Sequence, residues 1–145
     1  MSQWAWKSYV KGSKGATLVQ EWFREVDKFV WTEFEASIRF LDGQPPANWT
    51  RPFVSVLKGG KRGRKTGCIG LVEIRFEVKN VQYRPLGYFS DELEFTILFF
   101  AKEVGNAFVP LAACNIAKTR IEKIKENKEK AREFWFEERK SKKHY

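Results

Sequence analysis

Residues 71–84, LVEIRFEVKNVQYR, and residues 93–102, LEFTILFFAK, decide the fold. In the first segment apolar residues alternate with charged ones, the period-two pattern of a strand that is buried on one face. Lys79-Asn80 suits a two-residue turn, since Asn tolerates a positive φ angle. The second segment is apolar on both faces, which is typical of a central strand. The stretch therefore predicts three consecutive antiparallel strands.

The same turn sets Arg75 directly opposite Arg84, on the face away from the apolar side chains of the first strand. Like charges that face each other across a ladder are unfavourable unless a negative charge lies near them. One interpretation is that this sheet face holds a polyanion. The other is that Glu73 and Glu77 neutralise both arginines in an ordinary exposed network. The pattern alone favours the network.

Length and composition indicate one folded domain, because 145 residues with 43% hydrophobic and 16% aromatic content can bury a core. No apolar run approaches the roughly 18 residues of a membrane span, and the N-terminus lacks the form of a signal peptide. We therefore expect a cytoplasmic protein with no membrane partner, in which Cys68 and Cys114 are both reduced. These cysteines and His144 are too scattered for a zinc site, so no metal and no other cofactor is expected.

The net charge of +9 favours an anionic partner such as nucleic acid, an acidic protein or a membrane surface. A glycine-rich basic segment between residues 51 and 66 contains no acidic residue. Its positive residues are Arg51, Lys58, Lys61, Arg62, Arg64 and Lys65. Such a loop can close on a phosphate backbone, or it can be a plain exposed loop.

The other elements are predicted from periodicity and capping residues. Residues 3–10 read as a short strand, and residues 16–41 as one helix or two helices with a kink, capped by Thr17. A second, shorter helix is expected over residues 48–57, and a last helix over residues 107–126. The aromatic residues 134–136 need burial, either against this domain or in a partner.

This order of elements resembles the RelE/ParE toxin superfamily, and short motifs agree with its phage-type HigB-like branch. The motifs are Arg51-Pro52, Leu57-Lys58-Gly59, Leu71-Val72-Glu73-Ile74-Arg75, Gln82-Tyr83-Arg84, Phe100-Ala101-Lys102 and, in the last helix, Pro110, Ala117 and Arg120. The resemblance implies a small α+β RelE-like fold, with two N-terminal helices packed on one face of a twisted antiparallel sheet and a C-terminal helix. It assigns residues 1–126 to the toxin domain and leaves residues 127–145 as a charged helical C-terminal extension, through which the chain could form a homo-oligomer.

Proteins that the chain resembles are toxins of type II toxin–antitoxin systems. They are mRNA interferases that cut the codon in the ribosomal A site, by metal-free attack of the ribose 2′-OH on the adjacent phosphate. The resemblance therefore implies a cognate antitoxin, the ribosome and mRNA as partners. It assigns phosphate stabilisation to Arg84, a second basic role to Arg75 and an assisting role to Lys102. The loop residues that would grip ribosomal RNA are Lys58, Lys61, Arg62, Arg64 and Lys65.

The chain departs from this pattern after Lys102, where Glu103 follows in place of further basic residues, and no histidine precedes His144. The proton carriers of the reaction are therefore not assigned. Their absence suits a non-enzymatic inhibitor on the same fold, such as a ParE-like gyrase poison. A catalytically decayed, basic nucleic-acid-binding protein is the third alternative.

Overall fold

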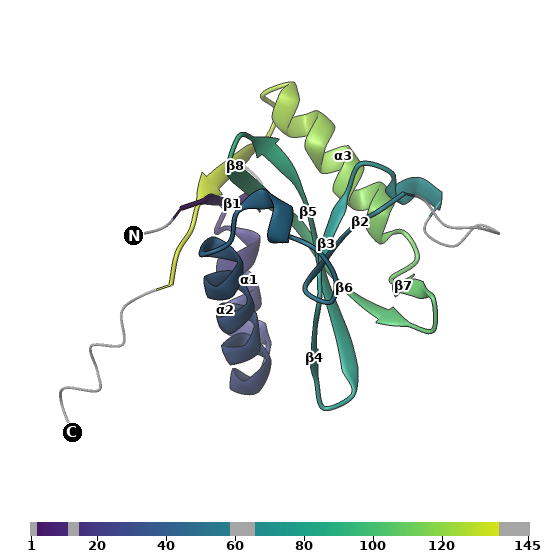
Figure 1. The fold of residues 1–145 in the computed structure, drawn as a ribbon. Helices are drawn as coiled ribbons and strands as arrows, with labels where there is room; N and C mark the ends of the chain where they lie inside the picture. Colours follow the sequence, from purple (N-terminus) through teal and green to yellow (C-terminus); the bar gives the residue numbers. More distant parts are fainter. Residues whose placement is uncertain (1–2, 12–14, 59–65, 137–145) are drawn as a thin grey trace.

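The computed structural model describes residues 3–11, 15–58 and 66–136, which form one mixed sheet and three α-helices (Figure 1). The strands are β1 (Ala5–Val10), β2 (Val54–Val56), β3 (Val72–Ile74), β4 (Phe76–Val78), β5 (Val81–Asp91), β6 (Glu94–Val104), β7 (Ala107–Val109) and β8 (Lys130–Glu133). The helices are α1 (Leu18–Glu25), α2 (Lys28–Asp42) and α3 (Ala113–Lys125). The predicted α+β class is therefore confirmed.

The strands follow the order β2-β3-β5-β6-β1-β8, with β4 beside β5 and β7 beside β6. β1 runs parallel to β6, pairing Trp6 with Phe95, whereas the other ladders of the described chain are antiparallel. The expectation of an antiparallel sheet is wrong at this one pair. The long connection from β1 through α1 and α2 allows it, because parallel neighbours need a crossover and not a hairpin.

The central hairpin has the predicted register. Phe76 pairs with Tyr83 and Val78 with Val81. Lys79 and Asn80 form the turn with φ angles of 51° and 67°, the left-handed conformation of a type I′ turn. β6 is central as predicted, since it lies between β5 and β1.

Residues 16–41 form two helices rather than one. Thr17 accepts a hydrogen bond from the Gln20 N–H at 3.1 Å, and the Gln20 side chain accepts one from the Thr17 N–H at 2.8 Å. Asp27 then caps α2 by accepting from the Phe29 and Val30 N–H groups at 2.9 and 3.0 Å. The break falls at Asp27 because a capping aspartate has an extended backbone.

Two predicted helices are wrong in part. Residues 48–57 form turns and the edge strand β2, because Val54 gains burial by pairing with Ile74. The last helix begins at Ala113 and not at residue 107, because residues 107–109 pair with β6 as β7. In both places β-branched and aromatic residues favour strand pairing over a short helix.

The C-terminal extension is not helical over residues 130–133, where β8 pairs antiparallel with β1. The aromatic residues that follow return to this domain: Phe136 is buried, with ring centroids 5.5 Å from Trp31 and 5.8 Å from Phe34. Burial of these rings outweighs the charged, helix-like pattern before them. Residues 137–145, including His144, lie outside the described chain.

Two apolar cores lie on opposite faces of the sheet. The larger one packs α1, α2, Phe134 and Phe136 against strand residues, namely Ile74, Phe76, Phe95 and Ile97. The smaller one packs α3 against Leu71, Leu86 and Leu98 (Figure 1). In the ranges that the structure describes, no helix has both the length and the apolar character needed to cross a bilayer.

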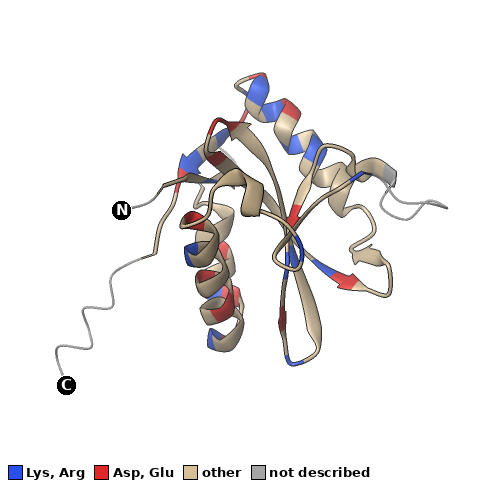
Figure 2. Cartoon of the chain, in the orientation of Figure 1, with Lys and Arg blue, Asp and Glu red and all other residues tan. Residues whose placement is uncertain are grey.

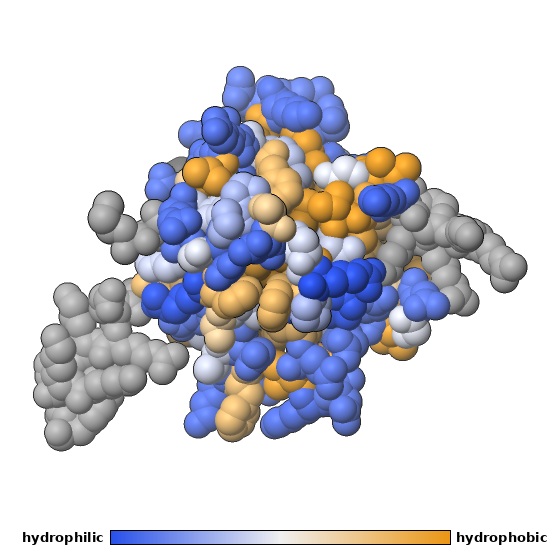
Figure 3. Space-filling view, in the orientation of Figure 1, coloured by the Kyte–Doolittle hydropathy of each residue, from blue (hydrophilic) through white to orange (hydrophobic). Residues whose placement is uncertain are grey.

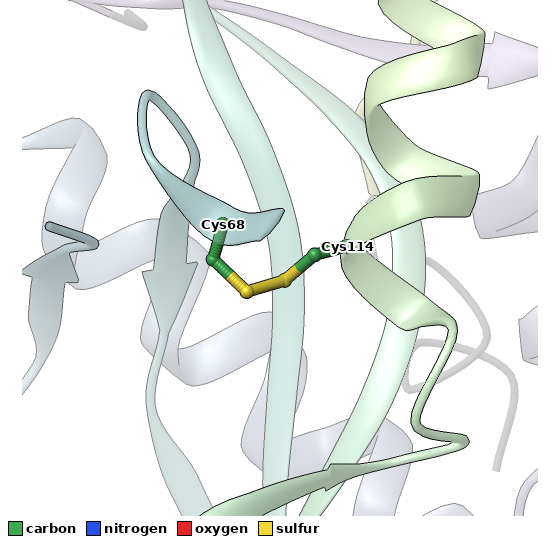
Figure 4. Close-up of a disulfide and its surroundings, with 2 residues drawn as sticks. All are labelled: Cys68 and Cys114. Carbon is green, nitrogen blue, oxygen red and sulfur yellow. A yellow bond between two sulfur atoms is a disulfide. The ribbon is translucent and has the colours of Figure 1, made fainter. Parts of the chain in front are cut away.

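A disulfide joins Cys68 to Cys114, with their Cα atoms 5.1 Å apart (Figure 4). Cys68 ends the short 3₁₀ turn η2 (Thr66–Cys68), and Cys114 lies in the first turn of α3. The prediction that both cysteines are reduced is wrong, although the burial expected for Cys114 is correct. Disulfides persist mainly in oxidising compartments, so the cytoplasmic location stays a prediction that this bond does not favour.

We expect the double variant Cys68→Ser with Cys114→Ser to lower the free energy of unfolding by about 2–4 kcal/mol, because the bond closes a long loop in the unfolded chain. The separation of 46 residues places the effect toward the upper end of that range. Urea titration of both proteins, with and without reductant, measures it. Reductant should destabilise the wild-type protein alone. Equal stability of the wild-type protein and the variant in the absence of reductant would contradict the prediction.

A polar cluster fastens α3 and the start of β8 to the sheet. The Tyr9 hydroxyl donates to Glu129, and the Arg120 guanidinium lies 4.4 Å from the centroid of the Tyr9 ring. Arg120 Nη1 also donates to the Leu98 carbonyl at 2.7 Å. Burial of the hydroxyl, and then its bond to Glu129, raise the pKa of Tyr9 to about 12.

The free energy of unfolding should therefore decline between pH 10 and pH 12. Tyr9 is protonated in both states below pH 10, but above it the unfolded chain releases this proton first and is favoured. Urea titrations across this range should show a shallower decline for Tyr9→Phe than for the wild-type protein. Parallel curves for the two proteins would show that Tyr9 does not contribute.

Candidate functional site

Arg84 lies on β5 and is fixed by three acceptors. Its Nε donates to Glu103 Oε1 at 2.8 Å, its Nη1 to the Tyr83 carbonyl at 2.8 Å, and its Nη2 to Gln82 Oε1 at 3.1 Å. Only 4% of the side chain is exposed, against 12% for Glu103. The guanidinium is therefore held rigidly, and the carboxylate beside it is the more exposed partner.

Arg75 lies between β3 and β4, where its N–H donates to the Phe53 carbonyl at 2.9 Å. The flanking pairs, Glu73 with Leu86 and Phe76 with Tyr83, share one register. That register sets Arg75 opposite Arg84, as predicted.

The Arg75 guanidinium forms an ion pair with Glu73, whose side chain is fully buried, while 20% of the Arg75 side chain is exposed. Each arginine thus has a carboxylate partner, and Glu73 neutralises Arg75 as the network interpretation predicts, although its side chain is buried and not exposed. The interpretation is wrong for Glu77, which accepts from Gln82 Nε2 at 2.5 Å. Figure 2 shows acidic segments beside basic ones along these strands.

Lys102 does not join the two arginines. Its cross-strand partner is Tyr83, and its Nζ lies 5.7 Å from the centroid of the Tyr83 ring. Because side chains alternate along a strand, Tyr83 and Lys102 share the face covered by α1 and α2, and Arg84 and Glu103 share the face that carries α3. Lys102 there lines a cavity of about 340 Å³ with Trp22 and Phe100.

The basic loop is described only at its ends. Lys58 is exposed directly after β2, and Arg51 is exposed in the turn before β2. The loop returns at η2, which the disulfide attaches to α3. The predicted RNA-binding residues Lys61, Arg62, Arg64 and Lys65 lie outside the described residues.

Carboxylates are the titratable groups that lie against the arginines. Tyr83 faces the other core, and Tyr88 packs near α3, where burial raises its pKa. The sequence does not indicate the contact of Glu103 with Arg84, because the two residues lie 19 positions apart. The register of the second hairpin, which pairs Gln82 with Glu103, is the signal that could have found it.

Within residues 3–11, 15–58 and 66–136, no group of histidine, cysteine and acidic residues is arranged to hold a metal ion. Comparisons with protein-family models, curated proteins and solved structures give no match to this chain.

Proposed function

We propose that the protein is the toxin of a type II toxin–antitoxin system, a RelE/ParE-type endonuclease of the HigB-like branch that cuts mRNA on the ribosome. The observation that carries the proposal is the pair Arg75 and Arg84, in register on one sheet face, each beside a carboxylate.

Metal-free cleavage of RNA needs positive charge near the phosphate and a base for the 2′-OH. Guanidinium groups match phosphate oxygens and stay protonated at neutral pH. A carboxylate is a suitable base, and the 2′-OH requirement selects RNA over DNA. Arg75 and Arg84 supply the charge, with Glu73 and Glu103 as the acidic groups that contact them.

The arrangement of the motifs also supports the proposal. Arg51-Pro52 precedes β2, and it is distant in the sequence from the motifs that end in Arg75 and Arg84. The strands next to these motifs, β2, β3 and β5, are nevertheless neighbours in the sheet. The first helices cover the opposite face. Three of the motifs that carry the resemblance therefore lie in one part of the fold.

Exposed side chains beside this region suit the proposed partners. Arg51 and Lys58 are exposed basic residues on its β2 side, where charge favours ribosomal RNA. Figure 3 shows apolar surface near η2 and β7, where the chain exposes Ile69, Val104 and Leu111 to 60%, 68% and 86%. An antitoxin with acidic and apolar side chains could cover both surfaces.

A purified translation reaction, read by primer extension on the mRNA, tests the proposal. Cuts should appear when the protein is added, and only on message that is being translated. The matched control is the same message with its ribosome-binding site blocked. Intact message together with normal protein synthesis would overturn the proposal.

One observation favours a second candidate, a non-enzymatic inhibitor such as a gyrase poison. Arg84 is almost fully buried and is already paired with Glu103, so its charge is balanced in the resting protein. A DNA supercoiling assay with gyrase separates the two candidates. Inhibition of supercoiling without mRNA cleavage would favour the gyrase poison. The absence of both effects would favour a basic nucleic-acid-binding module.

A further inference from the structure

We propose that Glu103 is the general base of the reaction and that Arg84 is its positioning residue. This inference depends on the proposed nuclease function and supplies the proton carrier that the resemblance leaves unassigned. In this assignment the Glu103 carboxylate contacts the substrate. The Arg84 guanidinium, to which the resemblance gives that contact, does not.

Exposure and contact select Glu103 from the carboxylates of this sheet face. Glu73 has a fully buried side chain, which cannot reach a ribose hydroxyl. Glu77 bonds to Gln82 and has no hydrogen bond or ion pair to Arg84 in the described structure. Glu103 contacts Arg84 at 2.8 Å and keeps 12% of its side chain exposed.

The contacts of Arg84 show how it acts through Glu103. Its Nη1 and Nη2 atoms are anchored on the Tyr83 carbonyl and the Gln82 side chain, so its Nε points at one oxygen of Glu103. The ionised carboxylate is the form that accepts a proton, and the guanidinium that contacts it supplies an opposite charge. It also fixes the direction of the carboxylate, and a base must lie within hydrogen-bond reach of the proton it removes.

In the proposed step the ribose 2′-OH gives its proton to the Glu103 carboxylate. The 2′ oxygen forms a bond to the adjacent phosphorus, and the bond from phosphorus to the 5′ oxygen breaks. The products are a 2′,3′-cyclic phosphate and a 5′-hydroxyl, whose oxygen takes its proton from water, and the hydroxide that remains takes the proton from Glu103. No electron is gained or lost, and no further reactant is needed.

Proton transfer also changes the charge of Arg84. In the resting protein Glu103 balances the guanidinium. When Glu103 becomes neutral, the guanidinium charge is no longer compensated, at the stage when negative charge grows on the phosphorane. Fixed charge that is directed at a developing anion in a dry site is a strong source of catalysis. The charge of Arg84 therefore acts on the phosphorane from behind Glu103, without contact between the guanidinium and the phosphate.

The test compares Glu103→Gln with Glu92→Gln, a control at an exposed carboxylate in the turn between β5 and β6, in single-turnover cleavage of ribosome-bound mRNA. Glu103→Gln keeps an oxygen that can accept from Arg84, so the fold should be retained. We expect its maximal cleavage rate to fall about 100-fold or more, with an unchanged protein concentration for half-maximal rate. Glu92→Gln should cleave like the wild-type protein.

A second variant, Glu103→Ala, distinguishes chemistry from structure. Added formate should restore part of its cleavage, because a small carboxylate can occupy the space left by the side chain, whereas it cannot repair a folding defect. Two results would overturn this inference while the wild-type protein still cleaves and the proposed function stands. One is full activity of Glu103→Gln, and the other is the failure of formate to restore cleavage by Glu103→Ala. No cleavage by the wild-type protein would overturn both.

Discussion

The Arg84→Ala variant is expected to lose ribosome-dependent mRNA cleavage and to become about 3–5 kcal/mol less stable to unfolding. The truncation removes a side chain of which 4% is exposed, together with its hydrogen bonds to Glu103, the Tyr83 carbonyl and Gln82. Loss of a buried ion pair and of two further hydrogen bonds to a charged group is costly. Primer extension measures the cleavage, and urea titration measures the stability.

A double variant separates the two effects. Arg84→Met together with Glu103→Leu replaces the ion pair by apolar side chains, which is often neutral for stability. We expect this protein to unfold near the wild-type urea midpoint and still to leave mRNA intact. Arg24→Ala, at an exposed position of α1, is the control that should change neither property. Cleavage by a folded Arg84→Ala protein would show that the site lies elsewhere.

The sequence predicted the central hairpin and its register well, because strict alternation and a turn residue that tolerates positive φ are local signals. Phe76 opposite Tyr83 and the left-handed Lys79 and Asn80 follow from them directly. The same register places Arg75 opposite Arg84. Local patterning was thus sufficient for the geometry of the two arginines.

The errors fall where distant parts of the chain compete for the same residues. β2 displaces a predicted helix because β3 offers Val54 a partner, and β8 displaces another because β1 has a free edge. No local pattern reports the availability of an edge. The side of the sheet on which Lys102 lies follows from pairing with β5, and the ion pair of Glu103 depends on the same pairing.

The disulfide shows the same limit. The sequence supplies two cysteines separated by 46 residues, and their contact depends on how η2 and α3 meet across the smaller core. Only the packing of α3 brings the two Cα atoms within bonding reach.

Phe34→Ala should cost about 3–5 kcal/mol in the free energy of unfolding, because it removes a large, fully buried ring from the core. The Phe34 ring lies between α2 and the sheet, with centroid distances of 5.3 Å to Trp22, 6.2 Å to Phe76 and 5.5 Å to Phe100. Surrounding rings cannot collapse easily into the space that it leaves, since they already pack against one another. Urea titration should show a lower midpoint with an unchanged slope.

Phe29→Ala provides the matched control on the same helix, because the Phe29 ring is 55% exposed and lies against the ammonium groups of Lys28 and Lys79. It should cost about 1 kcal/mol or less. Phe34 also supports the candidate site from beneath, since Phe76 follows Arg75 directly and Phe100 pairs with Pro85, the neighbour of Arg84. Equal costs for the two variants would mean that α2 is not anchored through Phe34, and the rigid backing of the two arginines would then need another source.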